Sequence, residues 1–166
     1  MLATVRAATP ADLDTVLALR LALLREAREH PIYGRLRPDA ERRARRLFRL
    51  QLESPKEVTL LAERAGKAVG ILRCVESEGS PLLEPARYAY VSSVYVVPEA
   101  RRLGVLRSLL RHASEWCAGR DLDEMRLHSV TGAIANAAWD ALGFQIVEQM
   151  RIRPIHRHSP GGCAQI

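Results

Sequence analysis

Residues 88–117, YAYVSSVYVVPEARRLGVLRSLLRHASEWC, decide the fold of this chain. They open with β-branched and aromatic residues, which predict a strand that Pro98 stops. A short basic turn follows and closes on Gly104. The apolar residues beyond Gly104 have helical spacing and predict one buried stripe, formed by Leu106, Leu109, Leu110, Ala113 and Cys117.

The start of this expected helix, near Gly104, is suited to bind an anion. The first backbone N–H groups of a helix lack intrahelical acceptors, and with the positive end of the helix dipole they favour a phosphate. Arg101 and Arg102 add fixed charge and forked donors at the same place. The alternative is a βα unit in which Gly104 eases a turn and the arginines are solvated. The flanking strand and helix favour the phosphate site.

The order of residues in this turn resembles the acetyl-CoA-binding signature of the GNAT superfamily of N-acetyltransferases. That signature is Arg or Gln, two residues, Gly, one residue, then Gly or Ala. Here it stands as Arg101, Arg102, Leu103, Gly104, Val105 and Leu106. Leu106 replaces the usual small residue, which bears on side-chain crowding. The resemblance implies acetyl-CoA as cosubstrate, with its pyrophosphate held by the backbone amides of this turn.

The segment from Asn136 to Phe144 resembles a second GNAT signature, in which Asn and Ala precede an aromatic residue, usually Tyr, four residues before Gly-Phe. Trp139 stands at the aromatic position, and Asn136 matches the Asn in type but not in register. The resemblance implies that Asn136 holds the pantetheine arm; a helix-terminal or surface role explains it equally. An indole has no accessible proton loss, so Trp139 is expected to pack against CoA or the core.

The composition narrows the class of protein. At 166 residues the chain suits a single domain, and its net charge of +6 suits an anionic partner, either a nucleotide cofactor or nucleic acid. The three cysteines lack zinc or disulfide spacing, which indicates a reducing compartment, and no apolar run could cross a membrane. A cytoplasmic protein is expected. His156 and His158 alone are too few ligands for a metal site.

Periodicity along the chain predicts a strand, two helices, three strands, a helix, a strand, a helix and a final strand. The strands are expected at 4–8, 58–63, 68–76, 88–97, 125–130 and 144–152, and the helices at 10–28, 39–53, 104–117 and 133–142. This order matches the GNAT topology. The resemblance implies an α/β (α+β) domain over residues 1–153, with a mixed, mostly antiparallel central sheet of about six strands flanked by about four helices. Residues 154–166 are expected to form a disordered C-terminal tail.

The resemblance implies direct attack of an amine on the acetyl thioester, without a covalent enzyme intermediate. It places the donor for the developing oxyanion on the central strand, at Val94, Tyr95 and Val96. The attacking amine must be neutral, so a base is needed. No residue of the central strand is acidic, and Tyr90 and Ser93 are the candidate catalytic residues. Glu84 and His128 are alternatives.

The expected partners are acetyl-CoA and an amine acceptor, a small molecule or a peptide, and a homodimer stays open. The acceptor is expected to meet the loop 30–37, whose arginines suggest a carboxylate or phosphate, although solvation explains them as well. A catalytically impaired CoA-binding protein of the same fold is an alternative, suggested by Leu106 and Trp139. A basic nucleic-acid-binding domain is another. Against it, the sequence has no helix-turn-helix, zinc or aromatic RNA-binding signature.

Overall fold

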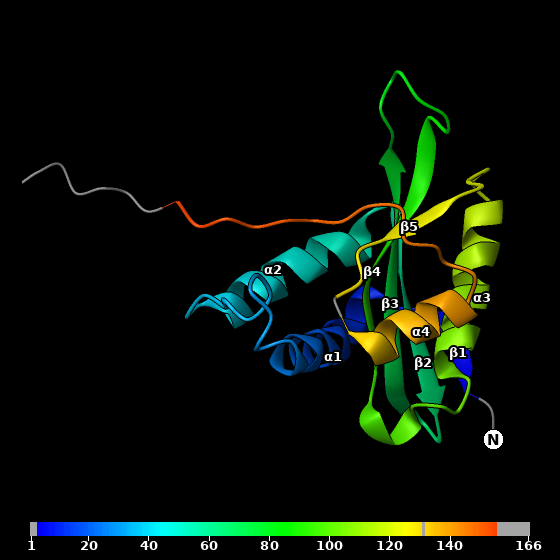
Figure 1. Cartoon of the computed structure of the whole chain (residues 1–166). Coiled ribbons are helices and arrows are strands. Elements are labelled where there is room, and N and C mark those ends of the chain that lie inside the picture. The colour runs from blue at the N-terminus through cyan, green and yellow to red at the C-terminus, as the bar shows by residue number, and fades with distance from the viewer. Residues whose placement is uncertain (1–2, 131, 156–166) are drawn as a thin grey trace, which may run out of the picture. The chain divides into compact units, whose positions relative to one another are not determined.

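The computed structural model describes residues 3–130 and 132–155. The chain divides into two compact units, residues 1–131 and 132–166. The first unit contains strands β1 (Thr4–Ala7), β2 (Glu57–Arg64), β3 (Lys67–Glu78), β4 (Arg87–Val96) and β5 (Met125–Leu127), and helices α1 (Leu13–Glu26), α2 (Ala40–Glu53) and α3 (Val105–Ala118) (Figure 1). Short 3₁₀ turns at Pro10–Asp12 and Pro98–Ala100 precede α1 and α3.

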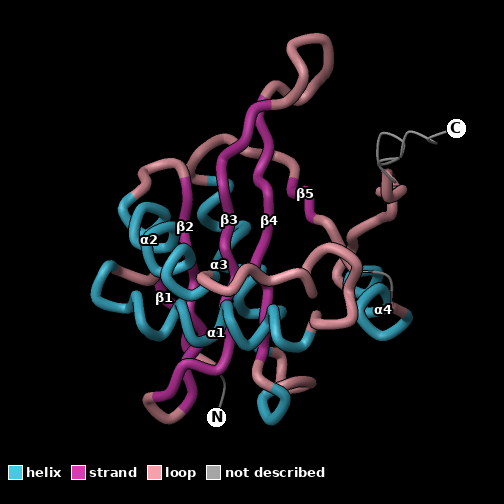
Figure 2. The backbone as a smooth tube through the Cα atoms, turned by 90° about the vertical axis from the view of Figure 1, so that its left-hand side faces the viewer, coloured by secondary structure: helices cyan, strands magenta, loops and turns pink. Residues whose placement is uncertain are grey.

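The five strands form one sheet in sequence order, β1-β2-β3-β4-β5 (Figure 2). The first three pairings are antiparallel, and β5 pairs with β4 in parallel. A two-residue turn closes the β2–β3 hairpin, with positive φ at both Ala65 (48°) and Gly66 (73°). That geometry matches the right-handed twist of paired strands, which is why a short Gly-containing segment predicts a hairpin here.

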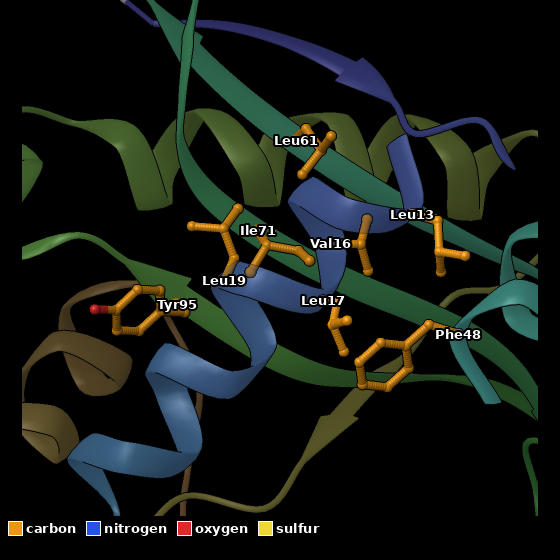
Figure 3. Packing of buried hydrophobic residues seen from close by; sticks show 8 residues of the cluster. All are labelled: Leu13, Val16, Leu17, Leu19, Phe48, Leu61, Ile71 and Tyr95. Atoms are coloured by element: carbon orange, nitrogen blue, oxygen red, sulfur yellow. The ribbon is translucent and has the colours of Figure 1, made fainter. Parts of the chain in front are cut away.

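Helices α1 and α2 cover one face of this sheet and α3 covers the other (Figure 2). On the first face a buried apolar cluster joins α1, α2 and the strands (Figure 3), and it consists of Leu13, Val16, Leu17, Leu19, Phe48, Leu61, Ile71 and Tyr95. On the second face Cys74 Sγ lies 3.9 Å from Cys117 Sγ of α3. A Cβ on Gly70 would come within 3.0 Å of Val105, so the glycine permits the close approach of α3 to β3.

The second unit contains α4 (Ala133–Ala141), whose C-terminal end is capped by backbone hydrogen bonds. Gly143 has φ 87°, its N–H donates to the Asp140 carbonyl at 3.0 Å, and the Phe144 N–H donates to the Trp139 carbonyl at 3.0 Å. These two bonds define a Schellman motif. The rings of Trp139 and Phe144 pack edge to face with centroids 5.3 Å apart, which supplies the apolar contact that usually accompanies it.

The predicted α/β class and the order of elements from Thr4 to Ala141 are confirmed. The strand predicted at 144–152 is wrong, and the sheet has five strands. A strand requires a pairing partner, and the described part of the second unit contains no strand; Ile146 and Val147 there are 67% and 89% exposed.

Three other expectations concern the ends of the chain and the membrane. The domain boundary at residue 153 stays a prediction. The expected tail at 154–166 falls, from residue 156 on, outside the described residues, as do His156 and His158. None of the helices described is long and apolar enough to cross a bilayer.

Candidate active site

Strand β4 carries a β-bulge in its C-terminal half. Ile71 of β3 pairs with Tyr95 while Arg73 pairs with Ser92, so Ser93 and Val94 lie opposite the single residue between Ile71 and Arg73. Ser93 has φ 57°, which is uncommon for a residue other than glycine. A bulge bends its strand and interrupts the ladder, and it often adjoins a functional site.

Beyond this bulge, one edge of β4 is unpaired among the described residues. The Val97 N–H donates to the Val69 carbonyl of β3 at 3.0 Å, and because strand groups alternate, the N–H and C=O groups of Val94 and Val96 point to the opposite edge. On that edge β5 pairs only with residues 89–91. The Val96 carbonyl accepts from Arg101 Nε, and the other backbone groups of this edge are offered to a ligand.

The three residues expected to provide the oxyanion donor differ in their placement. Val94 and Val96 lie on the unpaired edge by this alternation. Tyr95 is only 7% exposed, and its side chain lies in the cluster under α1. Its hydroxyl donates to Glu26 Oε1 at 3.1 Å, and both burial and this carboxylate raise the pKa of Tyr95.

Helix α3 begins directly after Gly104, which has φ 77°. Its first backbone bond runs from the Ser108 N–H to the Gly104 carbonyl at 3.0 Å. The backbone N–H groups of residues 102–107 have no acceptor within the described part of the chain. A Cβ on Gly104 would meet no atom within 4 Å, and Leu106 is half-buried. An open helix N-terminus of this kind binds anions through its amides and dipole.

The arginines of the turn have different surroundings. Arg101 donates from Nη2 to both carboxylate oxygens of Glu26 at 2.7 and 2.8 Å, and from Nε to the Val96 carbonyl at 2.8 Å. Arg102 is exposed with φ 63°, and Leu103 is 46% exposed. Arg101 therefore holds the turn against α1 and β4, and Arg102 keeps its charge toward solvent.

Two candidate catalytic residues lie in direct contact. The Tyr90 hydroxyl is 2.8 Å from Nδ1 of His128, which follows β5, and the rings meet edge to face with centroids 5.6 Å apart. Burial raises the pKa of Tyr90, and the nearby Tyr33 and Tyr88 act in the same direction. A phenol that keeps its proton beside an imidazole forms a proton-transfer pair.

The other candidates have no such partner. Ser93 lies in the bulge, and its hydroxyl makes no hydrogen bond to a described residue. Glu84 lies in the β3–β4 loop, where its carboxylate accepts from the Ala86 N–H at 3.2 Å. In the loop 30–37, His30 and Tyr33 stack with ring centroids 4.5 Å apart.

A polar cluster next to Tyr90 and His128 was not predicted from the sequence. Arg73 of β3 forms an ion pair with Glu57 of β2 and donates to Ser92 Oγ at 3.3 Å. Arg20 of α1 lies near both charged residues. The available signal was a charged residue inside an apolar strand, since Arg73 stands within GILRCV.

The two candidates of the second unit are described within that unit alone. Asn136 is half-buried, and its backbone N–H donates to the Gly132 carbonyl at 3.1 Å. Trp139 packs against Phe144 in the helix cap.

Comparisons with known proteins agree with this architecture. The acetyltransferase (GNAT) family model matches residues 21–144. A predicted acetyltransferase from Clostridium acetobutylicum, solved with acetyl-CoA, superposes with a TM-score of 0.76 at 17% identity, covering 95% of this chain and 100% of that one. An aminoglycoside 6′-N-acetyltransferase from Acinetobacter haemolyticus gives 0.72 at 23%, covering 93% and 99%.

A GCN5-related N-acetyltransferase from Ralstonia eutropha JMP134 gives a TM-score of 0.73 at 22% identity, covering 92% of this chain and 98% of that one. The search of curated proteins found no match. Because the family model spans about three quarters of the sequence, the chain belongs to the acetyltransferase (GNAT) family.

Proposed function

We propose that this acetyltransferase moves the acetyl group of acetyl-CoA to the amine of a small molecule or peptide by direct attack, with Tyr90 and His128 handling the protons. The observation that carries the proposal is the 2.8 Å contact between the Tyr90 hydroxyl and His128 Nδ1, beside the unpaired edge of β4. Imidazole and phenol groups are able to exchange protons during catalysis.

The cosubstrate would bind along the first unit. The open amides at the start of α3 and the exposed Arg102 suit a diphosphate, as the motif from Arg101 to Leu106 leads us to expect. The N–H groups of Val94 and Val96 and the Val94 carbonyl, on the free edge of β4, suit the amides of the pantetheine arm and the thioester oxygen. The roles of Asn136 and Trp139 toward CoA stay predictions.

In the proposed reaction, protons pass from the amine to the thiolate through His128 and Tyr90. The amine nitrogen forms a bond to the thioester carbonyl carbon, the carbon–sulfur bond breaks, and the amine proton passes to the His128 imidazole. Tyr90 donates its hydroxyl proton to the departing thiolate and regains one from His128. A backbone N–H on the free edge of β4 would stabilise the oxyanion formed on the way.

The test is release of free thiol from acetyl-CoA over a panel of amines. Tyr90→Phe and His128→Gln should each lower kcat by about 10²- to 10⁴-fold. His112→Gln, which removes a histidine of α3 bonded to the Ser108 carbonyl, should not. Thiol release unaffected by both pair variants would remove Tyr90 and His128 from the mechanism. Acetyl-CoA binding without thiol release from any amine would favour the catalytically impaired CoA-binding protein.

The proposal also includes the cellular compartment of the protein. Cys74 and Cys117 are free thiols although their sulfur atoms lie only 3.9 Å apart, and this supports a cytoplasmic enzyme. A homodimer stays an untested prediction, and the nucleic-acid-binding domain stays an alternative against which the missing sequence signatures argue.

A further inference from the structure

Arg20 is a half-buried cation without a bonded counter-ion. It lies on α1, and its guanidinium stacks over the Phe48 ring of α2 at 4.4 Å from the centroid. No described residue accepts a hydrogen bond from it or forms an ion pair with it. Buried charges in proteins are normally paired, because desolvation without compensation is unfavourable.

The carboxylate that acts on the Arg20 charge, that of Glu57, is already engaged. Glu57 forms its ion pair with Arg73, whose second donor group bonds Ser92. Two cations, Arg20 and Arg73, therefore lie in the field of Glu57, and only Arg73 is bonded to it. Burial and the charge of Arg73 lower the pKa of Arg20 to about 10, and Glu57 opposes this only partly. At neutral pH Arg20 stays charged, so one positive charge in this cluster is uncompensated.

The uncompensated charge lies on the same face of the sheet as the proposed proton-transfer pair. Ser92 pairs with Arg73 across the β3–β4 ladder, and Tyr90 lies two residues before Ser92. Side chains at i and i+2 of a strand share a face. Neighbouring strands are about 4.8 Å apart, so Arg73, whose charge acts on Arg20, lies one strand away from this part of β4.

The cation is also remote from the expected diphosphate site. Glu26, which holds Arg101 in the turn before α3, lies six residues further along α1 than Arg20. That separation is about 9 Å along the helix axis. The position of Arg20 on α1 therefore separates it from the residue that holds the turn before α3.

We propose that Arg20 binds an anionic group, a carboxylate or phosphate, on the amine acceptor, so that the preferred substrates are anionic amines. The proposal rests on the proposed acetyl transfer and adds the substrate class. A planar guanidinium binds either group through two parallel hydrogen bonds. A polycationic acceptor would place its charge against Arg20 and Arg73, which is unfavourable.

The experiment compares matched acceptors. We would measure kcat/KM for a series of ω-amino carboxylates with their primary amides, for O-phosphoethanolamine with ethanolamine, and for an aminoglycoside. The anionic member of a pair should be favoured by about 10- to 150-fold, the usual effect of a charge-assisted hydrogen bond. Arg20→Gln should abolish this preference, Arg20→Lys should retain part of it, and Arg25→Gln, an exposed position on the same helix, should leave it unchanged.

Two further readouts separate this proposal from the proposed function. Thermal stabilisation by the same acceptors detects binding without turnover, and stabilisation by acetyl-CoA should be equal in Arg20→Gln and the unmodified protein. Efficient turnover of neutral or cationic amines without an anionic preference would overturn the substrate class and leave acetyl transfer intact. Loss of acetyl-CoA stabilisation in Arg20→Gln would assign the cation to the cofactor and overturn the proposal. Absence of both turnover and acceptor binding would overturn both proposals.

Discussion

Glu26, the last residue of α1, binds the Arg101 guanidinium through both carboxylate oxygens, at 2.7 and 2.8 Å. The Tyr95 hydroxyl donates to the same carboxylate. One acidic side chain thus joins the first helix to the central strand and to the turn before α3. The arginine at the start of the expected cofactor motif consequently holds the turn in place, in addition to any attraction it exerts on a phosphate.

Removing either partner should lower stability by a modest amount. Both side chains are about 45% exposed, and such ion pairs contribute about 1 kcal/mol at most. A double-mutant cycle of Arg101→Ala and Glu26→Gln, followed by urea denaturation, should give a coupling energy of about 0.5–1 kcal/mol. Additive effects of the two changes would mean that the pair contributes nothing in solution.

The pH dependence of turnover should report Tyr90. Burial raises its pKa above the ordinary value of a tyrosine, about 10, so the phenol keeps its proton throughout the neutral range. If Tyr90 is the proton donor, activity should decline on the alkaline side only above about pH 10. Tyr90→Phe should lower kcat and remove this decline. An unchanged alkaline profile in the variant would assign the decline to another group.

The capping interaction before α1 should make the stability of the protein depend on pH in the acid range. Asp12 accepts two bonds from Arg6, at 2.7 and 2.8 Å, and one from the Thr9 N–H at 2.8 Å. The Arg6 guanidinium holds the pKa of Asp12 well below its usual range. The ionised form is therefore favoured by folding, so its contribution is complete above about pH 4 and declines as the pH falls further.

Asp12→Asn should accordingly destabilise the protein by about 1–3 kcal/mol at pH 7, measured by urea denaturation, and by less at about pH 3. Glu41→Gln offers a control, since Glu41 is an exposed carboxylate in the first turn of α2. A difference between Asp12→Asn and the unmodified protein that stayed constant with pH would contradict the assignment.

The order of elements was predictable because local signals agree with it. Thr9 and Pro10 before α1 and the Gly66 turn in the first hairpin each have a direct physical reason. The segment 144–152 has an equally good strand pattern and forms no strand. Its pattern specifies which side chains could share a face, and only a neighbouring strand can supply the hydrogen bonds.

The site was predictable where function depends on the backbone and less so where it depends on contacts between distant residues. Gly104 and the start of α3 follow from a short motif. The contact between Tyr90 and His128 depends on the parallel register of β4 and β5, and the residue types alone do not predict it. The same holds for Arg20, whose lack of a counter-ion is visible only once Glu57 is seen to pair with Arg73.

The central claim is that the start of α3 binds the diphosphate of acetyl-CoA. The most direct test measures thermal stabilisation by acetyl-CoA in three proteins: the unmodified chain, Gly104→Val and Gly66→Val. Gly104 and Gly66 have φ of 77° and 73°, and a Cβ on either would meet no atom within 4 Å. Both substitutions should therefore cost about 1–2 kcal/mol through backbone strain alone. At 100 times its dissociation constant, acetyl-CoA should add about 2.7 kcal/mol and raise Tm by several degrees. We predict that this rise is kept in Gly66→Val and lost in Gly104→Val; an equal rise in both variants would contradict the account.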